Sequence, residues 1–385
     1  MKNKANILVF KFSLVLGGGE RFNLVLGQGL KNKGHRIKFF SNYKPLVKRL
    51  RESGIKSKKM YWGKEMGARR NIVEYTILWL PNKIRFFLIL FFNKKYKTKN
   101  IVILQSLHEK ILATSMARFL GYNVFWVEHL SIRPWLTNSR FRGSYVKKVD
   151  SVNKIIVISK LIKKELVEEF RIKDKKIEVI YHGIDLKKFY PLEERLIEAK
   201  KKEFGFYKES KIVGYVGRLH KEKGLDILIR SFSQLAKRFA PIYLLLIGEG
   251  PNRKELELLV KKLDLEKNVF FLGYRDDVST LVNMMDVFVL PSKVRESFGI
   301  VLIEAMAAGK ITIGSNLGGI PEIINNKKNG FLFEPGDEKQ LTDYISRVLS
   351  DNELRRKIEG NAIRTVREKF SEEVMIKNLE RTLTK

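Results

Sequence analysis

The 385-residue sequence predicts an α/β fold made of two halves, each a doubly wound parallel sheet. Short apolar runs typical of buried strands alternate with longer helical patterns along the chain. A glycine-containing turn follows the first strand of each half, at residues 17–19 and again at 217–224, so the strand–turn–helix pattern starts twice. The length also suits two domains, each able to bury its own core.

The first half opens with a strand at 7–10, and a helix follows the turn Gly17-Gly18-Gly19 and ends near Gly34. Three successive glycines let the backbone come close to a ligand, or simply make a sharp turn. The turn lacks the GxGxxG spacing of nicotinamide and flavin sites. We expect a further helix at 107–120. The later strands of this half are predicted at 37–40, 101–104, 124–127, 154–158 and 177–180.

The second half repeats the pattern after a charged, helix-like linker at 192–202. A helix is predicted at 225–239, and Asp337 is placed to cap another helix. In such sheets ligands bind beyond the carboxyl ends of the strands, so we expect a ligand cleft between the two sheet edges. The strands of this half are predicted at 212–216, 243–247, 269–272, 287–290 and 311–313.

The charge of the chain is strongly positive and unevenly placed. The formal net charge is +33, and the first 100 residues hold 24 Lys and Arg against 4 Asp and Glu. Such a surface is either simply solvated or has an anionic partner, which is a nucleic acid or an anionic membrane. No nucleic-acid recognition motif is found in the sequence. The absence of cysteine excludes a disulfide scaffold and thiolate metal sites, and it fits a reducing compartment.

Residues 76–92 are apolar on nearly every side and are interrupted by Lys83 and Arg85. The run falls short of the roughly 20 apolar residues that a membrane-spanning helix needs. One interpretation is a buried helix ahead of the strand at 101–104. The other is a helix whose outer face dips into a bilayer while its lysines meet lipid phosphates. Both hold if one side packs on the sheet.

Two glutamates bracket the turn that follows the strand at 287–290. Glu296 precedes a predicted helix that ends at Gly309, and Glu304 lies inside it. Eight positions at about 1.5 Å rise separate them by about 12 Å, roughly the reach from a nucleotide ribose to the sugar beyond its diphosphate. The helix N-terminus between them favours a phosphate. The alternative is an ordinary solvated helix face.

Arg218 and Lys223 lie five positions apart in a glycine-flanked loop directly after a strand. A planar guanidinium and a flexible ammonium suit a diphosphate, and they would stabilise the charge that grows on a nucleoside diphosphate leaving group. Otherwise they are ordinary surface basic residues. The sequence contains no Asp-x-Asp and no convincing metal-ligand spacing, so we expect a site that works without a metal ion.

His129 follows the predicted strand at 124–127. At that position it would hydrogen-bond a sugar hydroxyl or act on the proton of an acceptor, or it is a structural hydrogen-bonding group. The remaining histidines are interpreted as structural or are left without a role: His35, His108, His182 and His220.

Six segments of the second half, in this order and spacing, resemble the retaining GT-B glycosyltransferases of family 4, also called group 1. Gly17-Gly18-Gly19-Glu20-Arg21 resembles the same family, which more often has Ala at the third of these positions. The six segments are Val216-Gly217-Arg218 with Glu222-Lys223-Gly224, Ile247-Gly248-Glu249-Gly250-Pro251, Phe271-Leu272-Gly273, Leu290-Pro291-Ser292, Glu296-Ser297-Phe298-Gly299 with Glu304-Ala305-Met306-Ala307, and Gly318-Gly319-Ile320-Pro321-Glu322.

The resemblance implies a role for each matching residue. Arg218 and Lys223 would contact the donor diphosphate, Glu304 the ribose hydroxyls and Glu296 the hydroxyls of the donor sugar. His129 matches a strand-end histidine near the transferred sugar, and with Glu296, Arg218 and Lys223 it forms the predicted catalytic set. The other predicted donor-binding residues are Gly18, Gly19, Gly248, Gly273 near the base, and Phe298, Gly299 and Ile300 through their backbone groups.

The resemblance implies a GT-B fold of two Rossmann-like domains. Residues 1–188, with the last helix from about 371 to 385 packed back on them, would bind the acceptor, and residues 189–370 would bind the nucleotide sugar. The expected reaction moves a hexose-type sugar from a UDP or GDP sugar to a lipid-linked glycan or glycolipid. It would proceed without a cofactor, with retention by front-side attack, at the cytoplasmic face of an anionic membrane. The alternatives are a sugar-nucleotide epimerase or phosphorylase of the same fold, or a basic nucleic-acid-binding protein.

Overall fold

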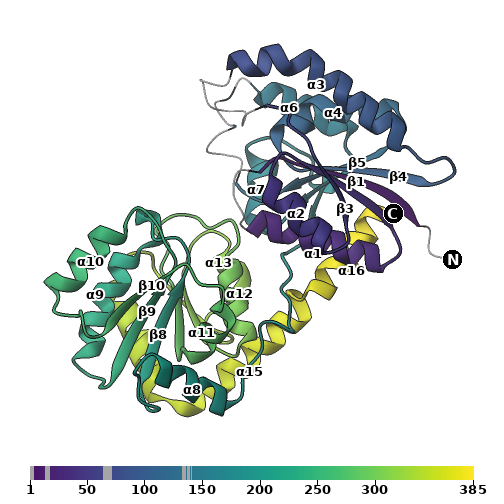
Figure 1. Cartoon of the computed structure of the whole chain (residues 1–385). Coiled ribbons are helices and arrows are strands. Elements are labelled where there is room, and N and C mark those ends of the chain that lie inside the picture. Colours follow the sequence, from purple (N-terminus) through teal and green to yellow (C-terminus); the bar gives the residue numbers. More distant parts are fainter. Residues whose placement is uncertain (1–3, 14–17, 64–71, 132–135, 137–138, 140) are drawn as a thin grey trace. The chain divides into compact units, whose positions relative to one another are not determined.

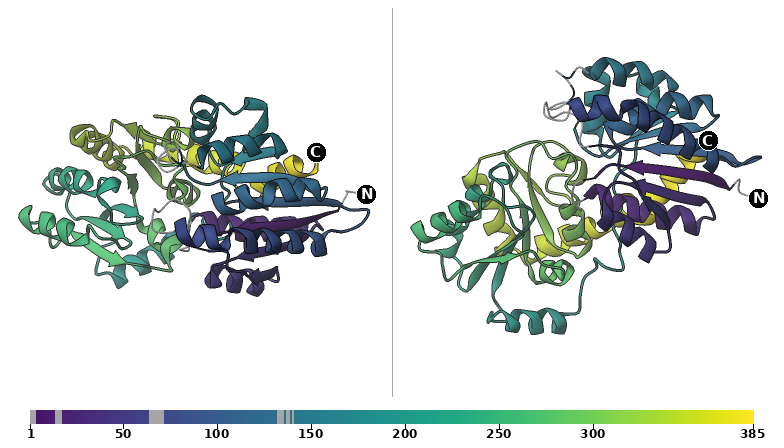
Figure 2. Two further views of the ribbon diagram at one scale, coloured as in Figure 1. Left: turned by 90° about the horizontal axis from the view of Figure 1, so that it is seen from above. Right: turned by 45° about the horizontal axis from the view of Figure 1, so that its top comes forward.

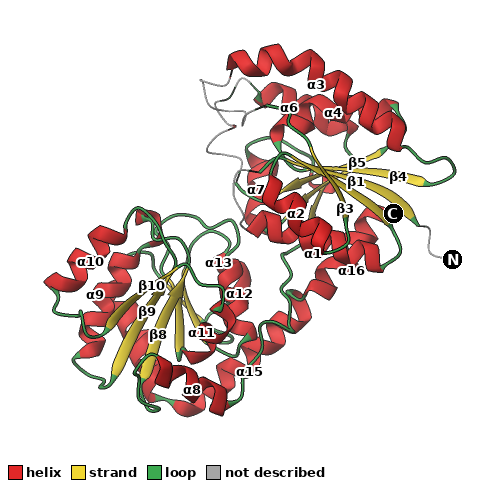
Figure 3. Ribbon diagram, viewed as in Figure 1, coloured by secondary structure: helices red, strands yellow, loops and turns green. Residues whose placement is uncertain are grey.

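The computed structural model describes residues 4–13, 18–63, 72–131, 136, 139 and 141–385. Its contacts divide the chain into two units. Unit 1 comprises residues 1–183 and 372–385, and unit 2 comprises residues 184–371. From the sequence we predicted domains of residues 1–188, joined by the last helix from about 371, and of residues 189–370. Figure 3 shows strands at the centre of each unit with helices on both sides, which confirms the predicted α/β class.

Among the described residues, the sheet of unit 1 has seven strands, all paired in parallel, in the order β3-β2-β1-β4-β5-β6-β7. Figure 1 labels β1, β3, β4 and β5 of this sheet. Apolar residues alternate between its two faces because side chains alternate along a strand. The strands are β1 (Ala5–Lys11), β2 (Arg36–Ser41), β3 (Lys56–Lys59), β4 (Lys99–Leu104), β5 (Asn123–Glu128), β6 (Lys154–Val157) and β7 (Ile177–Val179).

The edge strand β3 was missed by the sequence analysis. Its sequence, Lys-Ser-Lys-Lys, contains no apolar residue, and pattern reasoning recognises strands by their apolar side chains. It pairs with β2 in the register Lys38↔Lys56. Lysines suit an edge because their charge discourages another chain from adding to the open side of the sheet.

One face of the unit 1 sheet packs on α1 and on the C-terminal helix α16, which lies beside the purple strands in both views of Figure 2. Ile7 and Val9 point to this side. A side chain at Gly29 in α1 would come within 2.4 Å of Ile376, so glycine allows the close approach of α16. The helices of unit 1 are α1 (Gly18–Asn32), α2 (Lys44–Glu52), α3 (Ile72–Asn93), α4 (Leu107–Phe119), α6 (Arg142–Lys148), α7 (Lys160–Glu168) and α16 (Glu372–Thr384).

The opposite face of the sheet is covered in part by α3, which contains the apolar segment 76–92. Asn82, Phe86 and Leu90 are buried, and the Phe86 ring lies 5.3 Å from that of Phe10. Leu88 and Phe91, on the other side of the helix, are 44% and 54% exposed. One side of α3 therefore packs on the sheet, as the first interpretation requires, while the other side is exposed, so the helix is not buried on every side. None of the helices that the structure describes is long and apolar enough to cross a membrane.

The sheet of unit 2 has six parallel strands in the order β10-β9-β8-β11-β12-β13. Residues 192–202, predicted as a linker between the halves, lie largely in α8, which belongs to unit 2 and packs on α11. Its strands are β8 (Lys211–Val216), β9 (Ile242–Ile247), β10 (Val269–Gly273), β11 (Val287–Leu290), β12 (Ile311–Ser315) and β13 (Phe331–Phe333).

Two helices of unit 2, α14 and α15, begin at an aspartate whose side chain caps the first turn. The Asp337 side chain accepts a hydrogen bond from the Gln340 backbone N–H at 2.9 Å, which confirms the predicted cap of α14. The helices are α8 (Glu194–Glu203), α9 (Leu225–Ala236), α10 (Arg253–Lys262), α11 (Val278–Met284), α12 (Ile300–Ala307), α13 (Ile320–Ile323), α14 (Glu338–Ser350) and α15 (Asn352–Lys369).

In each sheet the strand order reverses once, between β1 and β4 in unit 1 and between β8 and β11 in unit 2. Open α/β sheets bind ligands beyond the carboxyl ends of the strands at such a reversal. The loops that follow these four strands are therefore the first places to look for a site.

Candidate functional site

In unit 2 the two loops at the strand reversal are joined by Lys223 and Glu296. Lys223 ends a 3-10 turn (Lys221–Lys223) after β8, and Glu296 lies in the loop after β11. The Lys223 Nζ lies 2.5 Å from the Glu296 Oε1, and the Ser292 hydroxyl donates to the same oxygen at 2.5 Å. The Lys223 and Glu296 side chains are 16% and 17% exposed, so both remain accessible from solvent.

Glycines hold these loops in place. Gly224 has φ +66°, and a Cβ there would lie 2.0 Å from the Pro291 carbonyl oxygen, so only glycine lets the β8 and β11 loops touch. Gly318 has φ +67°, and a Cβ there would lie 2.6 Å from the Glu296 carbonyl oxygen. The Gly319 N–H donates to that same oxygen at 2.8 Å. The backbone at Glu296 is therefore fixed from both sides.

Arg218 lies close to this pair along the chain, but its side chain is exposed. Its carbonyl oxygen accepts a hydrogen bond from the buried Tyr215 hydroxyl at 2.9 Å, which fixes the backbone rather than the guanidinium. Burial, and then the nearby Glu296 carboxylate, raises the pKa of Tyr215. Arg218 therefore lies in the same loop as Lys223, but its exposed side chain is not held in place as the Lys223 side chain is.

The predicted glycines at the ends of β9 and β10 lie against each other. The Gly248 N–H donates to the Gly273 carbonyl oxygen at 2.8 Å. A Cβ at Gly248 would lie 2.0 Å from the Gly217 carbonyl oxygen, so this turn packs on the start of the β8 loop. These contacts bring the strand ends of β8, β9 and β10 together at one edge.

Helix α12 starts at Ile300, directly after Gly299, which has φ +109°. The Phe298 side chain is buried and its ring lies 5.7 Å from that of Phe370, so this residue offers only its backbone to a ligand. Glu304 is 7% exposed in the second turn of the helix. Residues 296–299 are not helical, so the separation of about 12 Å expected between Glu296 and Glu304 from helical rise does not apply.

In unit 1, Gly19, at the start of α1, lies beside His129, which follows β5. A Cβ at Gly19 would lie 3.7 Å from the His129 ring and 3.6 Å from the Lys11 Nζ. The His129 Nε2 is hydrogen-bonded to the Gln105 Oε1 at 3.0 Å. Gly18 is the first residue of α1, whereas Gly17 lies outside the described residues.

His182 is a neighbour of His129 that the sequence analysis left without a role. Their rings stack at 5.8 Å, and Phe22 meets the two rings edge-on at 4.8 and 5.4 Å. Burial lowers the pKa of His129 well below its usual value, and Lys11 lowers it further. Burial, and then the Arg21 cation, lowers the pKa of His182 to about 3. Both imidazoles are therefore neutral near pH 7.

The low pKa of His182 predicts that acid destabilises unit 1. Between pH 6.5 and about 3 the unfolded chain binds a proton at His182 that the folded chain does not, so the free energy of unfolding falls as the pH is lowered through this window. The expected loss from pH 7 to pH 5 is roughly 2 kcal/mol for this group. Urea unfolding at both pH values measures it.

His182→Gln is expected to reduce the difference between the two pH values, whatever its effect on stability at pH 7. His220→Gln is the control because His220 is partly exposed, with a side-chain exposure of 41%. An unchanged pH difference in His182→Gln contradicts the assignment of a buried neutral His182.

A buried polar network lies next to His129. The Lys110 Nζ donates to the Glu128 Oε1 at 2.6 Å and to the Val127 carbonyl oxygen at 2.9 Å, and the Tyr145 hydroxyl donates to the same Glu128 oxygen at 2.6 Å. Lys110, Glu128 and Tyr145 are at most 4% exposed. The network fixes the carboxyl end of β5, from which His129 projects.

The residues that sequence reasoning missed are Ser292, Lys11, Gln105 and His182. Ser292 was inside a quoted segment, and Gln105 and His182 each follow a strand, so their position after a strand end was the available signal. Lys11 is the last residue of β1 itself, so it does not follow a strand end and had no signal of this kind. Among the described residues, no group of three or more His, Asp and Glu side chains is placed to hold a metal ion. The metal-free site stays a prediction.

Two family models match the chain and together span most of it. "Glycosyl transferases group 1" matches residues 197–365, and "Glycosyltransferase Family 4" matches residues 16–188. The chain belongs to the family 4, group 1 glycosyltransferases. The residues joined at the β8–β11 reversal lie inside the group 1 match, and His129 lies inside the family 4 match.

Curated members of this family match about half of the chain. N-acetyl-alpha-D-glucosaminyl L-malate synthase of Bacillus anthracis is 35% identical over 54% of this chain and 53% of its own length. The capsular polysaccharide biosynthesis glycosyltransferase CapM of Staphylococcus aureus is 32% identical over 59% of this chain and 60% of its own length. The chain thus spans little more than half the length of the curated relatives it matches.

Solved structures match the glycosyltransferase chain over nearly its whole length. A glycosyltransferase from Rickettsia africae has a TM-score of 0.84 at 26% identity and covers 99% of this chain and 98% of its own. HepE of Anabaena, crystallised with UDP, has a TM-score of 0.83 at 20% identity and covers 98% of this chain and 99% of its own. The predicted GT-B fold, with two Rossmann-like parallel sheets, is confirmed.

Proposed function

We propose that this protein is a retaining glycosyltransferase that moves a hexose-type sugar from a UDP or GDP sugar to a hydroxyl of a lipid-linked glycan or glycolipid. One observation carries the proposal. Lys223 and Glu296, 73 positions apart in the sequence, meet at 2.5 Å at the strand reversal of unit 2. A cation beside a carboxylate at that edge suits a ligand that has a phosphate next to sugar hydroxyls.

In the proposed reaction the C1–O bond to the diphosphate breaks as the acceptor oxygen bonds to C1, and the acceptor proton passes to a leaving phosphate oxygen. Lys223 and Arg218 neutralise the charge that grows on the diphosphate, which lowers the barrier. Backbone groups at Phe298, Gly299 and Ile300, at the start of α12, hold the phosphate. Glu304 accepts hydrogen bonds from the ribose, and Glu296 accepts them from the sugar. No metal ion takes part in this scheme.

Unit 1 is proposed to bind the acceptor. The neutral His129 is suited to hydrogen-bond a sugar hydroxyl rather than to act as a cation, because its pKa is held well below the usual range. The Gln105 Oε1 fixes the ring through its hydrogen bond with the His129 Nε2. Gly19, beside the ring, leaves space that a side chain would fill.

We also propose that unit 1 lies on the inner face of an anionic membrane. Apolar side chains recur along the outer side of α3 at helical spacing, at Ile77, Leu80, Ile84, Leu88 and Phe91, and each is at least 44% exposed. We call these five residues the α3 stripe. The net +20 of residues 1–100, from 24 basic and 4 acidic residues, adds attraction to anionic lipid.

A thermal-shift screen of UDP, GDP and ADP sugars tests the donor. The matching nucleotide is expected to stabilise the protein by about 2.7 kcal/mol at 100 times its Kd. UDP-glucose is the first compound to test because HepE, a fold relative, has been crystallised with it. Glu304→Gln is expected to weaken binding by roughly tenfold to a hundredfold, with the exposed Glu266→Gln as control.

Product analysis separates the possible activities. Transfer should yield a product with the donor's anomeric configuration, in the presence of EDTA as well as without it. A strict need for added Mg²⁺ would contradict the metal-free scheme. A changed sugar on the nucleotide, without transfer, would instead identify an epimerase.

Flotation with anionic liposomes tests the membrane association. The protein is expected to float with phosphatidylglycerol vesicles at low salt, and less at high salt because salt screens the charges. Leu88→Gln with Phe91→Gln, in the α3 stripe, should reduce flotation. Protein that stays at the bottom with every vesicle would refute the association.

A further inference from the structure

Two adjoining hollows lie in unit 1, the first on the α3 side of the sheet and the second reaching from that side to Lys31 of α1. The first, about 670 Å³, runs between α3 and strands β2 and β3. Phe40 and Met60 on the sheet side, and Ile84 and Leu88 on α3, give it mainly apolar walls. Ile84 and Leu88 also belong to the α3 stripe, so this groove opens beside the surface proposed to meet the membrane.

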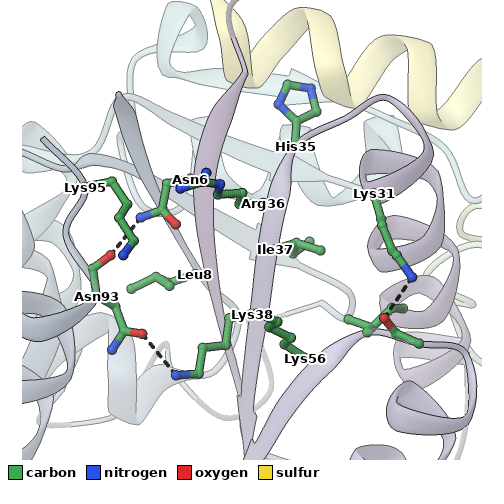
Figure 4. A pocket seen from close by; sticks show the side chains of 12 residues that line it. Asn6, Leu8, Lys31, His35, Arg36, Ile37, Lys38, Lys56, Asn93 and Lys95 are labelled. Atoms are coloured by element: carbon green, nitrogen blue, oxygen red, sulfur yellow. Dashed lines mark hydrogen bonds between the residues drawn. The ribbon is translucent and has the colours of Figure 1, made fainter. Parts of the chain in front are cut away.

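The second hollow, about 380 Å³, lies at the amino ends of β1, β2 and β3, opposite the carboxyl ends that carry the candidate site residues (Figure 4). Lys38 and Asn93 line both hollows, so the apolar groove passes directly into a basic region. No Asp or Glu is among the described residues that line either one. The basic side chains that line the second hollow are Lys31, Arg36, Lys38, Lys56 and Lys95.

Lys38 lies at the junction of the two hollows. Its Nζ donates to the Asn93 side-chain oxygen at 3.0 Å, as Figure 4 shows, and Asn6 holds the Asn93 backbone carbonyl at 2.9 Å. On the same face of the sheet, Lys38 is beside Lys56 and Phe40 is beside Lys58. Burial, and then the positive charges of Lys58, Lys56 and Lys95, lowers the pKa of Lys38. A bound anion would relieve this repulsion.

An apolar groove that ends in clustered lysines matches the two parts of an anionic lipid. We propose that this groove, which we call the α3 groove, binds one anionic phospholipid. Its hydrocarbon chain lies between α3 and the β2–β3 face, and its phosphate lies among Lys38, Lys56 and Lys58. The site rests on the membrane association proposed above, and it adds a specific lipid position to a general surface attraction.

Binding of a short-chain lipid below its micelle concentration tests the site without a membrane. Calorimetry with the full chain and dihexanoyl phosphatidylglycerol is expected to show binding at least tenfold tighter than that of glycerol phosphate, which lacks the chains, or dihexanoyl phosphatidylcholine, which lacks the net charge. Each CH₂ added to a chain held in the groove should strengthen binding roughly fourfold.

Variants assign the binding to the groove. Lys38→Gln with Lys58→Gln removes charge, while the amide introduced at position 38 can still donate a hydrogen bond to Asn93. Leu88→Gln changes the partly exposed apolar wall without opening the core. Each is expected to weaken binding at least tenfold. Lys44→Gln with Arg49→Gln, two exposed basic residues of α2 that line neither hollow, is the matched control and should leave it unchanged.

Three outcomes would overturn the proposal that the α3 groove binds an anionic phospholipid. Equal affinity for glycerol phosphate would mean a simple anion site, equal affinity for phosphatidylcholine would mean that charge is not recognised, and equal loss in the α2 control would mean non-specific attraction. Liposome flotation that persists without short-chain lipid binding refutes the groove and leaves the membrane association standing. Short-chain lipid binding without liposome flotation refutes the membrane association and leaves the α3 groove standing.

Discussion

Lys223→Ala is expected to lower kcat/KM for sugar transfer by a factor of about 10² to 10³, the usual cost of removing one preplaced group that stabilises transition-state charge. The Lys223 ammonium is held at 2.5 Å from Glu296, and the backbone after it is fixed by the contact of Gly224 with Pro291. The ammonium is therefore already in place before the reaction, so no free energy is needed to reorganise it. Steady-state kinetics with the donor identified by the thermal-shift screen measures the effect.

Lys221→Ala is the matched control for this experiment. Lys221 belongs to the same 3-10 turn, but its side chain is 72% exposed and pairs with Glu255 at 3.0 Å on the surface. A surface pair of this kind contributes about 0–1 kcal/mol, so we expect transfer within about twofold of the unmodified protein. If Lys223→Ala and Lys221→Ala behave alike, Lys223 is not part of the donor site.

Lys110→Met is expected to lower the free energy of unfolding of unit 1 by about 3–5 kcal/mol, because it leaves the Glu128 carboxylate buried without its cation. The Tyr145 hydroxyl would remain as a donor at 2.6 Å, but it carries no charge to offset the carboxylate. Urea unfolding followed by tryptophan fluorescence measures the loss. All four tryptophans lie between residues 62 and 135, so this signal reports unit 1.

Two further variants make the result specific. Lys164→Met removes a lysine that is 69% exposed and pairs with Glu168 at 3.9 Å, and it should cost about 0–1 kcal/mol. Lys110→Met combined with Glu128→Gln should regain part of the stability, because no buried charge then lacks a partner. A loss in Lys110→Met no greater than that in Lys164→Met would show that the network does not support β5.

The fold was largely predictable because its strands follow a simple rule. Parallel strands covered on both faces are continuous apolar runs, and the runs at 101–104 and 287–290 stand out for this reason. β3 fails the rule because an exposed edge strand of lysines has no apolar face to detect. The segment 192–202 was misplaced as a linker because α8 has no buried residue, so its charged sequence resembles a solvated connection.

The candidate site was predictable in part. Glycine turns after strands, together with the family resemblance, indicated Lys223, Glu296, Glu304 and His129 as candidates. Their contacts were not predictable, because a hydrogen bond between loops 73 positions apart depends on which strands are neighbours in the sheet. The stacking of His129 on His182 has the same origin, since the two residues follow different strands.

The sequence alone determined the two parallel sheets, the strand ends that carry the candidate residues, and the basic, apolar character of the first hundred residues. Local patterns suffice for these because strand and helix periodicity is a property of neighbouring residues. Tertiary packing pairs Lys223 with Glu296, buries one side of α3 while it exposes the other, and gathers lysines of β2 and β3 beside that helix. Strand order and helix docking set these contacts, and they arise only when distant segments pack together.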